Sequence, residues 1–377
     1  MSNKVTFAYY HGRAGLGVKI TAMEQDCEVV FPSEHEGEPI LEIGGVDSYS
    51  CRFCPTSVTI PASVKSIEKY AFDECKKLER VIFEEGSELG AICEAAFKDC
   101  ENLREFTLPE SVVLVSDYAF SECNSLCEIA FSEYFTAIGR GAFYKCPSLA
   151  RVTFHPDCAL TEIRDASFAS CKALTEIIIP KAVEVIDGSF TSCSSLQKVT
   201  FAKGSRLKDV KHSAFLGTIV SEWDLTNCAE LEFVGESSFS SYEAPAIKVI
   251  FPEGCKAEIH ECAFVRDITE YVNKPEGFVP VGTPEWNKKQ KKGCYVATCV
   301  YGSYDCPEVW TLRRYRDETL SASRLGRAFI KVYYAVSPTL VRWFGKTSLF
   351  QKICRGRLDK MVARLREKGV EDTPYED

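Results

Sequence analysis

The sequence lacks the features of a membrane-spanning or exported chain. No uninterrupted apolar run reaches the roughly 18 residues that a spanning helix requires. Residues 1–10 contain no basic segment followed by an apolar run, although a secretory signal peptide needs both. We therefore expect neither a transmembrane helix nor a signal peptide.

Residues that carry common chemistries are also scarce. The five histidines fall in different segments at unrelated positions: His11, His35, His155, His212 and His260. Nucleophilic catalysis by Cys or Ser generally uses a histidine beside the nucleophile. The glycines of residues 12–17 have neither the spacing of a phosphate-binding loop nor a following helix pattern. We therefore predict no catalytic residue, no cofactor and no small-molecule substrate.

Cysteine, in contrast, is abundant, with 19 residues. Such a count suggests disulfides in a short secreted chain, but this chain is long and no signal peptide is expected. Six of the cysteines recur at one position of a repeat, and cysteines on its neighbouring coils would lie about 4.8 Å apart with parallel side-chain vectors. A disulfide needs vectors that converge. We therefore predict reduced, buried cysteines and a cytoplasmic protein.

A single CxxC motif, at Cys51 and Cys54, raises the question of zinc. Tetrahedral zinc would need two further ligands, and Cys27 or Cys75 would have to come near. The sequence has no second CxxC and no HxxxH motif, so we favour the interpretation without metal.

A unit of about 24 residues recurs along most of the chain. Its anchor is a phenylalanine preceded by Ala or Ser, at Phe72, Phe97, Phe120, Phe143, Phe168, Phe190, Phe215, Phe239 and Phe264. Six copies carry Cys three residues later, at Cys75, Cys100, Cys123, Cys146, Cys171 and Cys193. A leucine follows three residues further on in the same six copies. This spacing of three predicts a single helical or 3₁₀ turn.

The period then changes to two, which indicates a short β-strand. The β-branched and aromatic runs lie at residues 81–83, 106–108, 129–131, 152–154, 177–179 and 199–201. One short strand and one helical turn cannot bury an apolar face alone, so neighbouring coils must stack. The sequence therefore predicts an α/β solenoid with short parallel strands along one face and Phe, Cys and Leu in internal ladders.

The unit resembles the BspA-type leucine-rich repeat, which commonly reads SIGxxAFxxCxxLxxIxIP. Residues 137–154, AIGRGAFYKCPSLARVTF, match that pattern almost position for position. The resemblance covers roughly residues 28 to 270. It implies a leucine-rich-repeat solenoid used for recognition, and it implies no catalytic residue.

Composition divides the chain further. We predict an N-terminal cap with first strands at 1–48, the solenoid at 49–272, a linker at 273–293, a helical domain at 294–370 and a tail at 371–377. The linker is rich in proline and glycine. In the helical domain we expect helices starting at Pro307, over 325–336 with an end at Ser337 and Pro338, through Trp343, and from Thr347 to Gly369.

The helical segment resembles the CFI-box C-terminal domain. Its opening residues 294–303 read CYVATCVYGS, and residues 333–338 read YYAVSP. That family implies no activity. Cys294, Cys299 and Cys306 are candidate reactive thiols, so a thiol-redox or other enzymatic module that uses the repeats for targeting is one alternative function.

Charge differs between the two ends of the chain. Residues 286–377 hold 19 basic and 10 acidic side chains, a net charge of +9. The whole chain has a net charge of −9, so residues 1–285 carry −18. Peripheral membrane or nucleic-acid binding by the basic C-terminal domain, with its aromatic stretch 329–350 and the lysines of 288–292 in the linker before it, is the other alternative function.

The leading hypothesis is a non-enzymatic module that binds a macromolecule, most simply a protein, through the solenoid surface. The contacting residues would be the variable charged positions beside each strand: Arg80, Arg104, Glu128, Arg151, Glu176 and Lys198.

Overall fold

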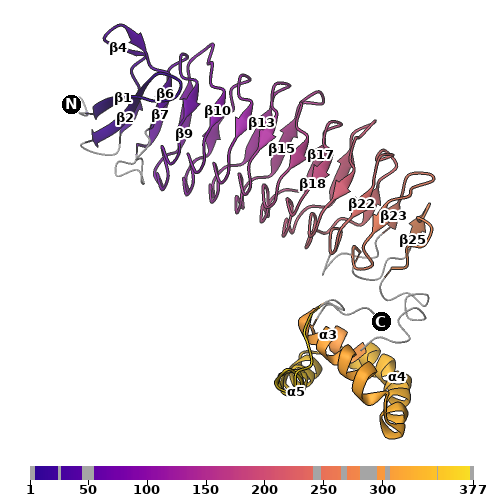
Figure 1. Ribbon diagram of the computed structural model, residues 1–377. Helices are drawn as coiled ribbons and strands as arrows, with labels where there is room; N and C mark the ends of the chain where they lie inside the picture. The colour runs from indigo at the N-terminus through magenta and orange to yellow at the C-terminus, as the bar shows by residue number, and fades with distance from the viewer. Residues whose placement is uncertain are drawn as a thin grey trace. The chain divides into compact units, whose positions relative to one another are not determined.

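The computed structural model describes residues 5–23, 27–44, 55–240, 248–264, 270–280, 295–301, 306–345 and 347–373. Two compact units, Met1–Gly282 and Thr283–Asp377, make up the chain. The first is a parallel-strand solenoid of about ten turns, and the second holds four α-helices (Figure 1). The predicted stack of short parallel strands followed by a helical region is confirmed. The CxxC motif and residues 281–293 of the predicted linker lie outside the described residues.

Each coil of the solenoid contributes one strand to each of two sides. We call the first side the long-strand side. Its members are β3 (Glu28–Val30), β7 (Ser57–Ile60), β9 (Arg80–Phe83), β11 (Glu105–Phe106), β13 (Glu128–Phe131), β15 (Arg151–Phe154), β17 (Glu176–Ile179), β19 (Lys198–Phe201), β21 (Glu222–Asp224), β23 (Lys248–Ile250) and β25 (Glu270–Val272). Burial alternates along these strands, as in β15, because successive side chains point to opposite faces.

The other side, the short-strand side, is built from strands of two residues. They are β6 (Glu42–Ile43), β8 (Ser66–Ile67), β10 (Ala91–Ile92), β12 (Leu114–Val115), β14 (Ala137–Ile138), β16 (Glu162–Ile163), β18 (Val185–Ile186), β20 (Asp209–Val210), β22 (Phe233–Val234) and β24 (Glu258–Ile259). Neighbouring strands pair in parallel, for example Ile92 with Val115. Their second residues place Ile or Val inside the stack, where Ile67, Ile92 and Ile138 are buried.

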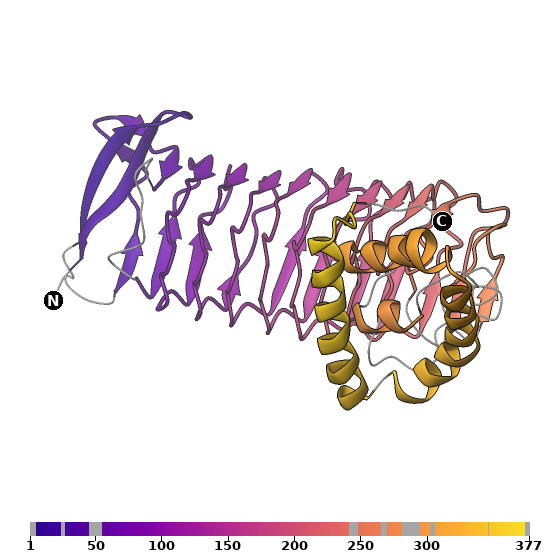
Figure 2. The same ribbon diagram turned by 60° about the horizontal axis from the view of Figure 1, so that its bottom comes forward.

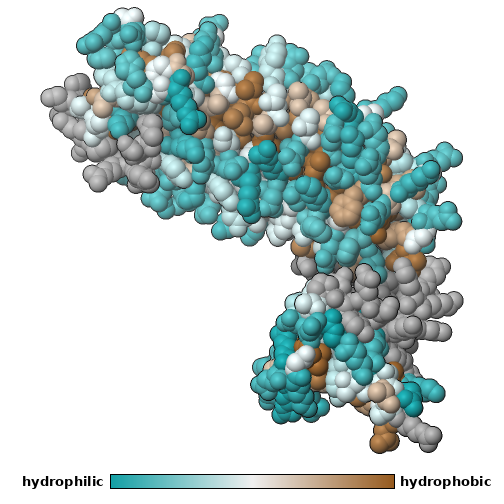
Figure 3. Space-filling view, viewed as in Figure 1, coloured by the Kyte–Doolittle hydropathy of each residue, from teal (hydrophilic) through white to brown (hydrophobic). Residues whose placement is uncertain are grey.

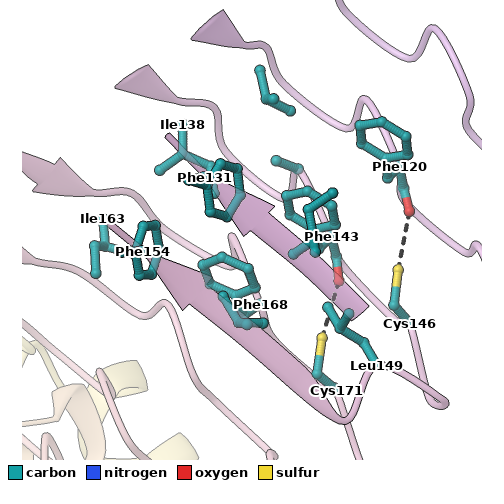
Figure 4. Close-up of a cluster of buried hydrophobic side chains, with 14 of the residues drawn as sticks. Phe120, Phe131, Ile138, Phe143, Cys146, Leu149, Phe154, Ile163, Phe168 and Cys171 are labelled. Atoms are coloured by element: carbon teal, nitrogen blue, oxygen red, sulfur yellow. Dashed lines mark hydrogen bonds between the residues drawn. The ribbon is translucent and has the colours of Figure 1, made fainter. Parts of the chain in front are cut away.

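The core is a column of stacked phenylalanine rings. The nine repeat phenylalanines form eight neighbouring pairs with ring centroids 5.0–5.7 Å apart and interplanar angles of 11° or less. Figure 4 shows Phe120, Phe143 and Phe168 in this column, with Phe131 and Phe154 of the long strands beside them. Because all nine rings are buried, the predicted internal ladder is confirmed.

The segment around each of these phenylalanines is a series of turns, not the predicted helical turn. The residue two before the Phe and the residue two after it have positive φ in most coils, as at Tyr118 (56°) and Glu122 (63°). This alternation turns backbone N–H groups toward the next coil, and Phe120 N donates to Ala142 O at 2.7 Å. Eight successive coils repeat that bond at 2.7–3.0 Å. These hydrogen bonds offset the conformational cost of residues with left-handed backbone. The spacing of Phe, Cys and Leu along the sequence does not reveal that backbone conformation.

The repeat cysteines are free thiols that join neighbouring coils by hydrogen bonds. Cys100, Cys123, Cys146, Cys171 and Cys193 each donate to the carbonyl oxygen of the phenylalanine one coil earlier, with Sγ to O distances of 3.0–3.2 Å (Figure 4). All five are fully buried. Burial raises the pKa of the Cys146 thiol to about 12, so the protonated donor form is retained.

An antiparallel hairpin covers the first coil (Figure 2). Strands β1 (Val5–His11) and β2 (Leu16–Met23) form it, and β2 pairs in parallel with β6. The buried carboxylate of Glu42 accepts a hydrogen bond from Ala14 N at 2.5 Å. A Cβ on Gly12 would lie 1.6 Å from Glu42 Oε2, so the hairpin turn requires glycine there.

The helical unit contains α2 (Tyr295–Tyr301), α3 (Pro307–Arg314), the π-helix η1 (Tyr315–Leu320), α4 (Arg324–Phe344) and α5 (Ser348–Glu367). Its core is formed by Ala297, Val309, Leu312, Val362 and Leu365.

Most of the predicted helix ends in this unit are confirmed. Pro307 opens α3, the Thr347 side chain accepts from Phe350 N at the start of α5, and Gly369 with φ of 84° follows its end. The predicted end at Pro338 is wrong, because α4 continues through that proline to Phe344. A proline removes one N–H donor, and the helical turns on both sides remain.

Candidate functional site

Five of the six predicted partner-binding residues occupy one row on the long-strand side. Arg80, Glu128, Arg151, Glu176 and Lys198 are each the first residue of their strand. Arg104 lies one residue before β11, and Glu105 is the residue that pairs in register with Arg80. The prediction of Arg104 is therefore wrong by one residue, because a count of eight from Phe97, as in the other five coils, gives Glu105.

The row carries charges of both signs, and several of them lie beside an opposite charge. Arg151 Nη1 lies 2.7 Å from Glu128 Oε2, and Arg80 Nη2 lies 2.8 Å from Glu28 Oε1. Glu176 pairs in register with Lys198 on the next strand. Exposed ion pairs of this kind contribute about 0–1 kcal/mol each. The row is thus a mixed-charge surface that offers both hydrogen-bond donors and acceptors.

A groove of about 760 Å³ opens on this side, over β9, β11 and the start of β13. Its lining includes the predicted residues Arg80, Arg104 and Glu128 together with Ile82 and Pro109. The groove lies where the sheet is interrupted, because β11 has only two residues and belongs to a different sheet from β13. Pro109 follows the shortened strand, but Pro61 and Pro180 follow β7 and β17, which pair with the next strand, so no sequence signal pointed to this interruption.

Exposed apolar side chains accompany the charged row. Ile82 and Ile178, the third residues of β9 and β17, are 46% and 63% exposed. In the space-filling view, apolar patches lie between polar side chains along the solenoid (Figure 3). A surface with apolar patches inside a polar rim is typical of protein interfaces.

Of the three candidate reactive thiols, the structure describes Cys299 and Cys306. Cys294 lies outside the described residues. Cys299 and Cys306 are half-buried, and burial raises the pKa of both thiols, which disfavours the nucleophilic thiolate. The Gln351 amide donates to Cys299 O and to Gly345 O, at 3.1 and 2.7 Å, so it ties α5 to α2. Within the described ranges, no group of three or more His, Cys, Asp or Glu side chains could hold a metal ion.

Comparison with known proteins agrees with this architecture. The model of the BspA type leucine rich repeat region matches six copies, over residues 45–171 and 161–283, well over half of the chain. No curated protein matches the sequence. The CFI-box resemblance of the helical unit stays a prediction.

Several solved structures are similar to the chain. A leucine rich cell surface protein from Faecalibacterium prausnitzii is 22% identical, with 70% of this chain and 86% of that one covered and a TM-score of 0.47. A leucine-rich repeat protein from Bacteroides ovatus is 21% identical, with 74% and 79% covered and a TM-score of 0.47. The leucine rich repeat protein of T. pallidum is 27% identical, with 54% and 89% covered and a TM-score of 0.38.

Proposed function

We propose that this chain, which belongs to the BspA-type leucine-rich repeat family, is a non-enzymatic module that binds a protein partner through the long-strand side of its solenoid. The observation that carries the proposal is the groove over β9, β11 and the start of β13, which lies at one of the breaks in the sheet of the long-strand side. It combines two arginines, several carboxylates and an exposed isoleucine on strands fixed by the core. Such a rigid, mixed surface suits a protein better than a small substrate.

The proposal places the protein in the cytoplasm. Its support is the ladder of free, buried thiols, which act as hydrogen-bond donors only while they remain reduced. A reducing compartment preserves that form. The helical unit would then be a CFI-box-like domain that accompanies the binding module.

The test is capture of a partner by the full-length chain from a lysate of its own cells, with quantification by mass spectrometry. The groove variant carries Arg80→Glu, Arg104→Glu and Glu128→Lys. We expect the groove variant to capture about tenfold less of the partner, or even less than that. Truncation of a single central interface residue already costs about 2 kcal/mol or more of binding free energy.

The matched control carries Arg140→Glu, Arg206→Glu and Glu162→Lys, which make the same changes of charge at exposed ion pairs away from the groove. This control should retain the partner at the parent level and melt at the same temperature as the groove variant. Equal loss of capture in both variants would show that net charge, and not the groove, determines binding. Undiminished capture by the groove variant would place the contact elsewhere.

A further inference from the structure

Helix α4 carries a continuous apolar stripe that the helical unit leaves in solvent. Leu325, Phe329, Val332 and Val336 are 86%, 60%, 63% and 47% exposed. Their spacing of four, three and four residues places them on one face of the helix. A stripe with this spacing normally packs against a core, so its exposure along about three turns marks a surface for contact.

Contacts on the remainder of the helix fix the stripe in this outward orientation. The Tyr333 hydroxyl accepts a hydrogen bond from Val296 N of α2 at 3.0 Å. Gly326 and Ser337, on the same side as Tyr333, are buried. At the start of the helix, the Ser323 hydroxyl accepts from Gly326 N at 2.9 Å. Rotation of α4 to bury the stripe would break the bond from Val296 to Tyr333 and would expose Gly326 and Ser337.

The stripe lies within a long segment that carries positive charge only. Residues 319–358 contain no Asp or Glu and eight basic residues: Arg324, Arg327, Lys331, Arg342, Lys346, Lys352, Arg355 and Arg357. Five of these are described and exposed: Arg327, Lys331, Lys352, Arg355 and Arg357. Of the flanking acids, Asp317 pairs with Arg316, and Asp359 accepts from the Tyr301 hydroxyl at 2.7 Å.

We propose that α4 binds in the plane of an anionic lipid surface. The stripe would enter the boundary between headgroups and acyl chains, and Lys331 would extend to lipid phosphates along its apolar stem. Arg327 lies on the opposite side of the helix and would add to the attraction at longer range. No helix in the described part of the chain is long and apolar enough to cross a membrane, which agrees with an in-plane orientation.

The combination of the stripe with the basic segment favours lipid over other occupants. A second copy seated on the stripe would bring two sets of like charges together with no acidic side chain between 319 and 358 to pair them. A nucleic acid would contact the basic side chains but would not require exposed aliphatic residues. An anionic bilayer offers both a negative surface and an apolar interior.

The experiment is co-sedimentation of the full-length chain with vesicles of phosphatidylcholine alone and of phosphatidylcholine mixed with phosphatidylserine. We expect binding to the mixed vesicles only, with a partition coefficient that falls as salt rises. The stripe variant Phe329→Gln with Val332→Gln and the charge variant Arg327→Gln with Lys331→Gln should each lower that coefficient about tenfold or more.

The matched control is Val30→Gln with Tyr134→Gln, which replaces a valine and an aromatic residue that are exposed on the solenoid. It should bind as the parent does. Far-ultraviolet circular dichroism of every variant should equal that of the parent, because all the substituted side chains are exposed.

Three outcomes would overturn the proposal. The first is no sedimentation with phosphatidylserine vesicles at low salt. The second is unchanged binding by the stripe variant, which would mean that charge attraction alone causes the binding. A nucleic acid would provide the same attraction. The third is a concentration-dependent dimer of the parent that the stripe substitutions abolish, which would assign the stripe to a second copy.

Discussion

At the residue scale, the sequence predicts that the repeat cysteines are buried but does not predict their hydrogen bonds. The spacing from each phenylalanine predicted their burial, and Cys123 and Cys146 are fully buried. Their donation to the phenylalanine carbonyl of the preceding coil depends on how turns from two coils meet, which no single repeat reveals. Parallel side chains thus join coils through sulfur without a covalent bond.

Asp73 is a residue whose charge opposes folding. One carboxylate oxygen, Oδ1, is buried without a hydrogen-bond partner, and burial raises the pKa of the group above 3.8. The folded state therefore binds the proton more tightly than the unfolded chain does. Stability falls as pH rises from 3.8 through the folded pKa, and the penalty is complete above it.

We predict that Asp73→Asn raises the melting temperature at pH 7 and that the gain disappears below about pH 4. Thermal unfolding across that pH range checks this. Asp157→Asn is the control of opposite sign, because a hydrogen bond from Lys181 lowers the pKa of the Asp157 carboxyl and so favours its charged form. Parallel behaviour of the two variants would contradict the assignment.

At the element scale, strands were easier to predict than the segments between them. Period-two runs of β-branched and aromatic residues gave β13, β15, β17 and β19 nearly to the residue. The hairpin of β1 and β2 lies outside the repeat, and no repeat pattern pointed to it. Pro338 lacks an N–H donor, which predicted a helix end there, but α4 continues through this proline to Phe344.

The candidate surface was likewise predicted only in part. The charged row could be located because each member is the first residue of a strand, but Arg104 was misplaced by one residue. The groove depends on the interruption between β11 and β13, a difference between coils that only the pairing pattern reveals.

The phenylalanine column acts as one element, so loss of an interior ring should destabilise the coils on both sides of it. Phe143 stacks between Phe120 at 5.1 Å and Phe168 at 5.4 Å. We predict that Phe143→Ala lowers the free energy of unfolding by about 3–5 kcal/mol, because the fixed coils on both sides cannot close the cavity. Denaturant unfolding measures this loss.

Tyr134, an aromatic residue of the neighbouring loop that is 58% exposed, provides the control. Tyr134→Ala should cost less than about 0.5 kcal/mol. Similar losses for the two variants would mean that the column does not stabilise the stack.

At the scale of the whole molecule, the solenoid is an array in which each coil contacts its neighbours. Removal of residues 121–143, one period of the repeat, joins Phe120 to Tyr144 and places Ser167 O opposite Phe120 N, where Ala142 O was. We predict that this variant folds and melts only a few degrees lower. Circular dichroism during heating checks the result.

Removal of residues 121–132, about half a period, is the contrasting variant. It places the polar and apolar positions of all later coils out of register with Phe120. This variant should lose the cooperative transition, and survival of that transition would contradict a register fixed by the core.

The thiol bonds also bear on how quickly the chain folds. They join residues only 25–28 positions apart, and the backbone bonds from each repeat phenylalanine to the next coil span similarly short separations. The entropy lost in closing each loop is therefore the same at the tenth coil as at the first. Folding rates fall with the sequence distance between contacting residues. This array can consequently lengthen its surface without lengthening the slowest loop that it must close.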